Sequence, residues 1–457
     1  MINVYRKIIK NGVEIKIKNK KYRFLYPAFV WGRFPKGLHR SFADSLTYIS
    51  TWHLPLVNKE PVAYHFPHPL IEPVFFKILT YSIPMNIFEN QEIKTTEFLK
   101  KFYNACFQNS YRCLNYLSLG KRTKKILKKQ ALVLFSFGKE SLLTYGLLKE
   151  MEIKTYLFFM REPQSTFENK HKKILAEKFY KKNGDRVFFF PISIGRLRQS
   201  RGFYWGWDII LSQYIFFLLP YFFAYQTRYV FLGNEQSCNF YLYDNEGYLI
   251  NPVFEQSIYA MQHQQDIPKQ FFINTHIGSL VEPIHELFIT YILHHRYPEV
   301  GAFQISCFSE NKNAKKKRWC GCCEKCARIY VFLRAFNLSP KRVGFYDNNM
   351  FSVKKESLYT IFNKTADSAY GGSGLGKEEQ LLAFYLAYKN GAVGDLINKF
   401  KKNYLRYVEQ KKERLINEFF GIHSSLSLPS ELRKKIITIF KKEQQQALDY
   451  VYKIIKK

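Results

Sequence analysis

Five cysteines gather in one stretch of the sequence, at Cys307, Cys320, Cys322, Cys323 and Cys326. With Cys307, the spacing Cys-x2-Cys-x2-Cys that begins at Cys320 supplies four thiolates, which suit the tetrahedral coordination of Zn²⁺. A closed site of four thiolates leaves no coordination position for water, so we expect a structural ion. Two alternatives stay open: Cys322 could replace Cys323 as a ligand, and an iron–sulfur cluster could take the place of zinc.

A second group of polar residues follows the apolar run 131–135 and comprises Ser136, Phe137, Gly138, Lys139, Glu140 and Ser141. Where a strand ends in a small Gly-containing turn that opens a helix, backbone N–H groups and the helix dipole favour a bound anion. Serine hydroxyls and a lysine add charge-assisted donors. The run is not a Walker A loop, because Val133 and Glu140 stand where that motif needs Gly and Ser or Thr. The alternative is an ordinary strand–helix turn with a capping serine.

A third polar group follows another apolar run, 228–233, and includes Gly233, Asn234 and Glu235. We expect this group on the same rim of a sheet as the segment 136–141, because both come directly after strand-like runs. Glu235 could hold Mg²⁺ between phosphates or orient a substrate. The alternative is a polar loop at the end of a strand.

Glu282, His285 and Glu286 form a fourth candidate group. The two carboxylates lie four residues apart with the imidazole beside them, so one helix face could bring them together for proton transfer. The alternative is a capped helix start with surface carboxylates. A Gly-rich run at 370–377 precedes another helical pattern and could be either a lid or a connector.

Strand-like and helical patterns alternate between residues 130 and 345, which indicates an α/β fold with a parallel sheet covered on both faces. The expected strands are 131–135, 155–160, 186–191 and 228–233. The expected helices are 140–151, 171–182 and 207–225. Parallel sheets bind ligands beyond the carboxyl ends of their strands, where the segment 136–141 and Glu235 would then lie.

The chain of 457 residues is too long for one ordinary domain, and its changes of pattern suggest three regions. Residues 1–125 begin with alternating apolar and charged residues around Val13 and Ile15, which predicts a hairpin in an N-terminal α+β region of unassigned role. Residues 126–345 hold the alternating pattern and the cysteines. Residues 346–457 are basic and mostly helical in pattern.

The composition limits the class of protein and its partners. Lysine and arginine number 70 against 37 acidic residues, a formal net charge of +33. Such a bias favours polyanionic partners: a nucleotide, a nucleic acid, an acidic protein or a membrane face. Hydrophobic residues make up 47% and aromatic residues 18% of the chain, which excludes an intrinsically disordered protein.

Neither the N-terminus nor the most apolar segment predicts export or a membrane span. The N-terminus lacks an apolar stretch of signal-peptide length, and the segment 209–224 is shorter than the roughly 20 apolar residues of a spanning helix. We expect a buried helix against the sheet and no membrane partner. Because the cysteines crowd together instead of spreading into a disulfide framework, we expect a reducing, cytoplasmic compartment.

The run SFGKES at 136–141 resembles the SGGKDS-type pyrophosphate loop of the N-type ATP pyrophosphatase (PP-loop) superfamily. The resemblance implies a Rossmann-like sheet of the HUP (adenine nucleotide alpha hydrolase-like) type that binds ATP, transfers AMP to a substrate oxygen and releases pyrophosphate. Two residues depart from the pattern: Phe137 replaces the first glycine of the pair, and Glu140 replaces the aspartate. Phe137 fits this position with a negative φ, unless the backbone strain of a positive φ is tolerated, because a positive φ strains any residue but glycine.

The cysteine region adds a second resemblance. The runs SCF at 306–308 and CGCCEKCARIYVFLRAF at 320–336 are similar to the zinc motif of the 7-cyano-7-deazaguanine synthase family. They are similar as well to the enzymes that epimerise UDP-N-acetylmuramoyl-L-alanyl-L-glutamate, which show a Gly-Asn-Glu-x-Ser segment comparable to 233–237. Together the motifs cover about half of the chain, residues 130–345.

The resemblance implies site residues and cofactors. The implied catalytic residues are Lys139, Ser136, Ser141 and Glu235. The implied nucleotide contacts are Ser136, Phe137, Gly138, Lys139, Glu140, Ser141, Phe158, Phe159, Met160, Gly233 and Asn234. The implied metal ligands are Cys307, Cys320, Cys323 and Cys326. The implied cofactors are ATP, Mg²⁺ and Zn²⁺.

These features favour an ATP-dependent, AMP-forming enzyme that adenylates a carboxylate or carbonyl oxygen of a small acidic or base-like substrate, in the manner of 7-cyano-7-deazaguanine synthase. One alternative is an epimerase-like enzyme acting on a peptidoglycan precursor. Another is a tRNA-modifying enzyme whose basic regions hold RNA; the same regions could instead bind an acidic protein. A fourth is a nucleotide-gated interaction module without turnover. An oligomer is compatible with each.

Overall fold

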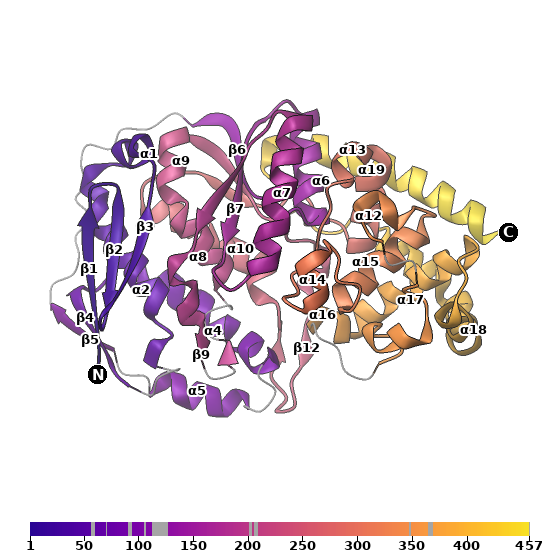
Figure 1. Ribbon diagram of the computed structural model, residues 1–457, viewed down its shortest axis with the longest axis horizontal. Coiled ribbons are helices and arrows are strands. Elements are labelled where there is room, and N and C mark those ends of the chain that lie inside the picture. Colours follow the sequence, from indigo (N-terminus) through magenta and orange to yellow (C-terminus); the bar gives the residue numbers. More distant parts are fainter. Residues whose placement is uncertain are drawn as a thin grey trace.

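The computed structural model places two sheets and a helical C-terminal region along one long axis (Figure 1). It describes residues 1–55, 60–69, 71–89, 94–104, 107–111, 127–200, 203–204, 209–346, 349–363 and 369–456. The N-terminal sheet lies at one end, the second sheet in the middle, and the C-terminal helices α18 (Asp395–Phe419) and α19 (Ser430–Ile455) extend to the other end.

A five-stranded parallel sheet forms the centre of the molecule, with the strand order β14-β11-β6-β7-β8. Its strands are β6 (Lys128–Leu134), β7 (Lys154–Arg161), β8 (Val187–Pro191), β11 (Thr227–Phe231) and β14 (His276–Gly278). The four strands expected from the sequence are confirmed, with ends that differ by a few residues. The edge strand β14 is only three residues long, too short for its pattern to stand out.

Side chains of this sheet alternate between two hydrophobic cores. Ala131 and Val133 of β6 face one core, and Leu132 between them faces the other. The first face is covered by α6 (Lys139–Glu150), α7 (Thr166–Asn183) and α12 (Glu286–Arg296). The second face is covered by α8 (Ile210–Phe217), α9 (Leu219–Tyr225) and α10 (Ile258–Gln264). Burial on both faces explains the continuous apolar runs of the strands and confirms the α/β class.

The N-terminal region builds a second sheet of order β3-β2-β1-β4-β5. Its strands are β1 (Ile2–Ile9), β2 (Gly12–Ile17), β3 (Lys20–Leu25), β4 (Val62–Pro67) and β5 (Phe107–Tyr111). Its helices are α1 (Ala28–Arg33), α2 (His39–Thr51), α4 (Glu72–Glu89) and α5 (Thr95–Tyr103). The first three strands are antiparallel, and Val13, Ile15 and Ile17 are buried from β2. The expected hairpin is confirmed, because alternating residues of a strand face opposite sides.

The apolar segment 209–224 forms two consecutive helices, α8 and α9, where the sequence predicted one helix over 207–225. The break falls at Leu218, and Pro220 stands in the first turn of α9, where its missing N–H and fixed φ are tolerated. Most residues of both helices are buried, which accounts for the apolar run. Within the described parts of the chain, no helix is both long enough and apolar enough to cross a bilayer.

The C-terminal region is mostly helical, as the sequence predicts, and packs on the same face of the sheet as α12. Its helices are α16 (Ala369–Gly372), α17 (Gly374–Lys389), α18 and α19, and α17 packs between α18 and the preceding helix α15 (Glu324–Ala335). The remaining short elements are α11 (Asp266–Gln270), α13 (Pro298–Gly301), α14 (Lys312–Lys316), β9 (Gln199–Ser200), β10 (Phe203–Tyr204), β12 (Leu242–Tyr243) and β13 (Leu249–Ile250). Single 3-10 turns are η1 (Lys36–Leu38), η2 (Ser193–Arg198), η3 (Gln236–Asn239), η4 (Phe254–Gln256), η5 (Pro340–Val343) and η6 (Val353–Leu358).

Each flanking region shares a hydrophobic core with the central sheet. The N-terminal region joins the core beneath α8 and α9, and the C-terminal helices join the core beneath α6 and α12. The three regions bounded at 125/126 and 345/346 stay a prediction, and the first boundary lies outside the described residues.

Candidate functional site

The central sheet reverses its direction of growth between β6 and β11, and the candidate site lies at this point. From β6 the chain adds β7 and β8 on one side, then returns to place β11 and β14 on the other. In open parallel sheets such a reversal leaves a crevice at the carboxyl ends of the strands, where ligands bind. The segments 136–141 and 233–237 follow β6 and β11 and meet at this edge. Gly233 permits the contact, since a Cβ there would lie 2.9 Å from the Cβ of Glu140.

Phe137 adopts a left-handed backbone conformation with φ +60°, so of the two alternatives the strained backbone is the one present. The strained residue is held by its surroundings. Its ring is fully buried and lies edge-on to Phe135 and Phe179, with ring centroids 4.7 and 5.8 Å away. Its carbonyl oxygen accepts a hydrogen bond of 2.8 Å from the backbone N–H of Ile305. The turn therefore keeps a glycine-like shape although it carries an aromatic side chain.

The two serines of the loop differ in their availability to a ligand. Ser136 is exposed, and its Oγ accepts a hydrogen bond of 3.2 Å from the N–H of Gly138 at the beginning of α6. Ser141 is buried in the first turn, and its Oγ donates to the carbonyl oxygen of Gly138 at 3.1 Å. Only Ser136 thus faces solvent beside the N-terminus of this twelve-residue helix.

Lys139 is buried and ion-paired rather than directed toward solvent. Its side chain is 5% exposed, and its Nζ contacts a carboxylate oxygen of Glu140 and lies 3.1 Å from Oε2 of Glu286. Burial works to lower the pKa of Lys139, but the charges of Glu140 and Glu286 outweigh it and raise that pKa above its ordinary value. The lysine is a permanent cation at the centre of the site.

Two buried carboxyl groups beside Lys139 favour protonation. Burial, followed by the charge of Glu140, raises the pKa of Glu235 well above its ordinary value. Burial and the charge of Glu286 raise the pKa of Glu379 to about 7. Glu379 accepts hydrogen bonds from the Tyr370 hydroxyl at 2.7 Å and from the N–H of Leu287 at 2.8 Å. Perturbed carboxyl groups of this kind gather at functional sites.

Glu286 remains ionised within the same cluster. Burial works to raise its pKa, but the charges of Arg328 and Lys139 outweigh it and hold the pKa of Glu286 at about 2. Nη1 of Arg328 donates to Oε1 of Glu286 at 3.0 Å, and Nη2 donates to Glu324 at 3.4 Å. Burial, followed by the charge of Arg328, lowers the pKa of Lys325. The cluster therefore holds several cations in a largely dehydrated setting.

Arg328 and Glu379 are the residues of this cluster that sequence reasoning missed. Arg328 follows Cys326 by two residues, and Glu379 lies within α17 beyond the Gly-rich run. Arg328 lies within the run 320–336 that resembles a zinc motif, in which only the cysteines are assigned a role, and Glu379 lies in no motif. Both helices carry several other charged residues, so the sequence does not mark these two apart.

Asn234, a residue implied to contact nucleotide, is 2% exposed, and its Nδ2 has no hydrogen-bond partner among the described residues. A buried donor without a partner is uncommon and costs free energy, so it marks a place where a ligand atom would be favourable. By contrast, the side chains of Phe158 and Met160 belong to the hydrophobic core, and Phe159 lies against Phe189. Contact of this strand with adenine stays a prediction.

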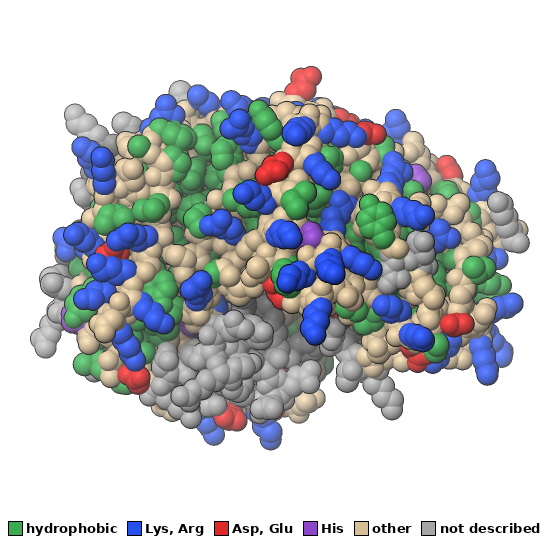
Figure 2. All heavy atoms as spheres, in the orientation of Figure 1, with side chains coloured by type: hydrophobic (Ala, Val, Ile, Leu, Met, Phe, Trp, Pro, Cys, Tyr) green, Lys and Arg blue, Asp and Glu red, His purple; other side chains and the backbone are tan. Residues whose placement is uncertain are grey.

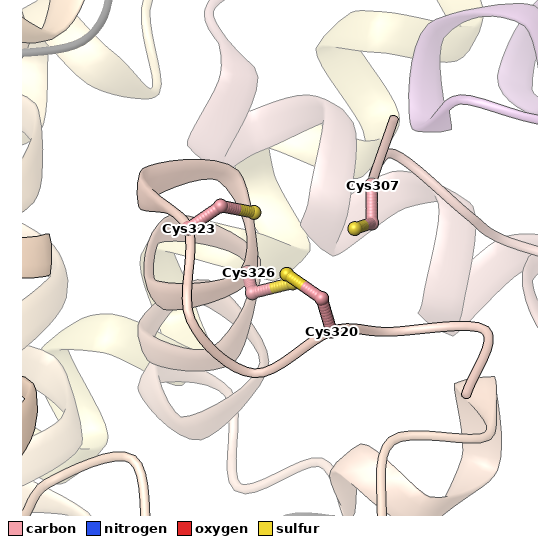
Figure 3. Close-up of side chains that lie close together, drawn as sticks. All are labelled: Cys307, Cys320, Cys323 and Cys326. Carbon is pink, nitrogen blue, oxygen red and sulfur yellow. The ribbon is translucent and has the colours of Figure 1, made fainter. Parts of the chain in front are cut away.

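The four predicted cysteine ligands come together in one cluster (Figure 3). The sulfur atoms of Cys307, Cys320, Cys323 and Cys326 all lie within 4.8 Å of one another. Cys322 points elsewhere: its Sγ accepts hydrogen bonds from the side-chain amides of Asn311, at 3.0 Å, and of Asn313. The geometry selects Cys323 over Cys322, and four converging thiols could hold a metal ion such as zinc.

The cysteine cluster is joined to the charged site through α15 and the segment before it. Cys323 is the residue before α15 and Cys326 lies in its first turn, so the cluster fixes the end of the helix that carries Arg328. Ile305, two residues before Cys307, makes the backbone hydrogen bond to Phe137. A metal at the cysteines would therefore stabilise the positions of both the loop 136–141 and Arg328.

Glu282, His285 and Glu286 do not share one helix face, which contradicts the proton-transfer hypothesis. The alternative of a capped helix start with surface carboxylates is contradicted as well, because Glu282 and Glu286 are buried and α12 has no side-chain cap. His285 is the residue before α12, and only Glu286 lies within the helix. Each contacts a different partner: Glu282 accepts from Ser427 at 3.1 Å, His285 contacts Glu418 at 3.1 Å, and Glu286 pairs with the cations described above. The chain turns at Pro283, and this turn separates the three side chains.

The Gly-rich run 370–377 forms a capped helix start. Ser373 precedes α17, and its Oγ accepts from the N–H of Gly376 at 3.0 Å. A Cβ at Gly376 would lie 2.1 Å from the carbonyl oxygen of Tyr370, so this glycine permits a close backbone contact. The run thereby places Tyr370 against Glu379, and it acts as a connector that contributes one residue to the site.

Lysine and arginine side chains dominate the face shown in Figure 2 and gather over α14, beside the cysteine cluster. Helix α14 packs on α7, where Nε2 of His171 lies 2.6 Å from the carbonyl oxygen of Ala314. The exposed lysines of these two helices and their flanks are Lys170, Lys173, Lys178, Lys181, Lys182, Lys312, Lys315, Lys316 and Lys317. The exposed lysines of α7, α14 and their flanks therefore form a local basic surface, in a chain whose overall composition is also basic.

Comparison of the chain with protein-family models, with curated proteins and with solved structures finds no match in any of the three. The site is therefore interpreted from its own geometry.

Proposed function

We propose that this protein is a PP-loop enzyme with a Rossmann-like, HUP-type core, which uses ATP to adenylate an oxygen of its substrate and forms AMP and pyrophosphate. One observation carries the proposal: the SFGKES turn joins β6 to α6 at the point where the sheet reverses, with Lys139 and Glu235 beside it. A helix N-terminus at a strand reversal is the usual place for a nucleotide phosphate in such sheets.

In this proposal the β- and γ-phosphates of ATP bind the turn 136–141. Ser136 and the backbone N–H groups donate to phosphate oxygens, and Lys139 exchanges a carboxylate partner for phosphate. Glu235 in its ionised form would be a ligand for Mg²⁺, and the charge of the ion would favour that ionised form. The Nδ2 of Asn234 supplies a further donor. These groups stabilise the negative charge that develops on the leaving pyrophosphate.

In the first step of the proposed reaction, one bond forms and one bond breaks. An oxygen of the substrate attacks the α-phosphorus, a new P–O bond forms, and the bond between the α-phosphorus and the bridging oxygen of pyrophosphate breaks. The two electrons of that bond leave with pyrophosphate. A second nucleophile then attacks the activated carbon of the acyl-adenylate or imidate, and the bond from that carbon to the phosphate oxygen breaks, so that AMP leaves with its electron pair.

The cations Arg328 and Lys325 favour an acidic substrate. Both lie on α15 at the edge of the charged cluster, and burial lowers the pKa of Lys325, as expected of a cation that a bound anion would stabilise. A carboxylate placed beside them would be held next to the α-phosphate. Both the carboxylated deazaguanine and the glutamyl-peptide classes carry such a group.

Turnover is tested by incubating the full-length protein with Mg·ATP and a substrate of either class whose carboxylate carries ¹⁸O. We expect AMP and pyrophosphate in equal amounts, with one ¹⁸O atom in AMP. Formation of ADP and phosphate, or of unlabelled AMP, would exclude adenylation of the carboxylate. Failure to bind Mg·ATP at all would overturn the whole proposal.

The loop is tested by Lys139→Met, with Lys149→Met as the matched control on the same helix. Lys149 is half-exposed and pairs with Asp185 at the far end of α6. We expect Lys139→Met to lower turnover by about 100-fold or more, because a preorganised charge on the leaving group is lost. Lys149→Met should retain wild-type turnover. Glu286 keeps Arg328 as a partner in the variant, so the fold should persist, as checked by thermal unfolding.

The lysine-rich surface over α14 favours a second candidate, an RNA-modifying enzyme. Its exposed lysines would contact phosphates and release counterions, so retention of tRNA would fall steeply with salt. Replacing Lys315, Lys316 and Lys317 with alanine should flatten the salt dependence by about two to three counterions. Unchanged retention would separate this surface from any role in RNA binding.

A further inference from the structure

A cluster of two histidines and one carboxylate uses none of the residues that the proposed function assigns to ATP, Mg²⁺ or the substrate. His285 precedes α12, Glu418 stands in the last turn of α18, and His423 lies in the loop between α18 and α19. One ligand atom from each of the three lies within 4.8 Å of the other two. Three elements that are far apart in the sequence thus bring metal-ligating side chains to one point.

We propose that His285, Glu418 and His423 bind a divalent transition-metal ion, a second metal site distinct from the four cysteines. Two imidazoles and a carboxylate form a ligand set that suits Zn²⁺, Co²⁺ and Fe²⁺ and that leaves coordination positions for water. The inference does not depend on the proposed adenylation, because it uses none of the residues assigned to ATP.

The hydrogen bonds of the two imidazoles leave one nitrogen of each ring for the ion. Nδ1 of His285 lies 3.1 Å from Oγ of Ser237, and its Nε2 lies 3.1 Å from Oε1 of Glu418. Nε2 of His423 lies 2.9 Å from the carbonyl oxygen of Glu418, so its Nδ1 is the ligand atom. Histidines that bind metals are oriented in this way, by an outer hydrogen bond on the second ring nitrogen.

The backbone holds the third ligand in place before any ion binds. The N–H of His423 donates to the carbonyl oxygen of Pro283 at 2.8 Å, which fastens the loop to the turn before α12. Farther along the loop, Ser427 donates to Glu282 through its hydroxyl at 3.1 Å and its N–H at 3.2 Å. The loop between α18 and α19 is therefore already ordered, and binding of the ion would cost it little conformational entropy.

The ligand cluster is shielded from solvent at His285 and open to solvent at Glu418. The side chain of His285 is fully buried, whereas that of Glu418 is 35% exposed. The rings of His285 and His423 are perpendicular, with centroids 4.9 Å apart, so the rings pack against each other while their nitrogens converge. An ion could reach the site from the Glu418 side.

The test is the metal content of the full-length protein after reconstitution with Zn²⁺ and removal of the excess. We expect two Zn²⁺ per chain, or one Zn²⁺ beside the iron of a cluster at the cysteines. His423→Ala and Glu418→Gln should each lose one Zn²⁺, while Cys320→Ser should keep the ion at the histidines. His68→Ala, at a histidine whose side chain is 43% exposed, is the control and should lose none.

Substitution with Co²⁺ separates the two sites by spectrum, since only thiolate ligands give an intense near-ultraviolet charge-transfer band. His423→Ala should keep that band and lose the weaker visible bands of the second ion. A wild-type chain that holds no metal outside the cysteines would overturn the proposal. So would full metal retention in both His423→Ala and Glu418→Gln, provided that circular dichroism shows that the variants are folded.

Discussion

Lys139 shows how far the surroundings of a residue can depart from what its motif implies. The position in SFGKES predicts a cation that reaches toward phosphate, yet the side chain is buried between Glu140 and Glu286. A bound polyphosphate would have to displace a carboxylate, so the proposed site is held by internal ion pairs until the nucleotide arrives. Removal of the lysine charge from this buried site is costly whichever residue replaces it, and Met is a better replacement than Ala because it fills more of the volume of the lysine stem.

Phe137 provides the sharpest test at the residue scale. Phe137→Gly would relieve a positive φ but remove a fully buried ring, and loss of such a ring costs about 3–5 kcal/mol. Because relief of the backbone returns only about 1 kcal/mol, we expect a net loss of about 3 kcal/mol in the free energy of unfolding, measured with urea. Affinity for Mg·ATP should persist, since glycine keeps the shape of the turn.

The control for this change is Phe137→Leu, which keeps the strain and most of the buried volume. Its free energy of unfolding should lie between those of the wild type and Phe137→Gly. A glycine variant at least as stable as the wild type would show that the ring contributes nothing to the packing of the turn.

At the scale of elements, helix α15 connects the cysteine cluster with the charged cluster around Lys139. Its N-terminal end is fixed by cysteines, and one face carries Lys325 and Arg328 toward the charged cluster. The segment before it reaches the loop through the hydrogen bond from Ile305 to Phe137. A structural metal at the cysteines would thus set the position of Arg328 without touching the substrate, as expected of a closed thiolate site.

Cys320→Ser and Cys322→Ser form a matched pair for this element. Because Cys320 lies in the cluster and Cys322 contacts Asn311, only the first change should lower metal content and melting temperature together. Metal content is measured by elemental analysis and stability by thermal unfolding. Full metal content in Cys320→Ser, or metal loss confined to Cys322→Ser, would contradict the ligand set.

At the scale of the whole molecule, the C-terminal region packs against elements next to the candidate site. Glu431 of α19 accepts a hydrogen bond of 2.7 Å from the hydroxyl of Tyr229 in β11, and Glu282 accepts from Ser427 across 145 residues of sequence. His285 and Glu418 add a third contact between the same two parts. Of the three carboxylates, Glu282 is buried, so its ionisation is coupled to the packing of the C-terminal region.

Glu282 makes this coupling measurable. Burial raises the pKa of Glu282 to about 7, from 4.5 in the unfolded chain. Its protonated form therefore stabilises the fold below pH 4.5, and this contribution of about 3 kcal/mol is lost as pH rises to 7. Urea unfolding at pH 5 and pH 8 should show a smaller decline for Glu282→Gln than for the wild type. Equal declines in the two proteins would place the titrating groups elsewhere.

The sequence by itself determined the local features of this protein. Apolar runs such as 131–135 and 228–233 form strands because a parallel sheet buried on both faces needs continuous apolar residues. The spacing of Cys320, Cys323 and Cys326 pointed to three neighbouring ligands, because residues three apart in a turn and a helix start lie close together. Alternation in β2 likewise determined its hairpin.

Only the tertiary structure decided which distant residues meet. It chose Cys323 over Cys322, turned Phe137 into a left-handed conformation, and split the helix expected over 207–225. It also brought Arg328 to Glu286, the partner of Lys139, and placed Glu379 against the N–H of Leu287, although the sequence assigned neither residue a role. These outcomes depend on side-chain packing and on electrostatic interactions in a dehydrated interior. Both act between residues that are far apart in the sequence and share no local pattern.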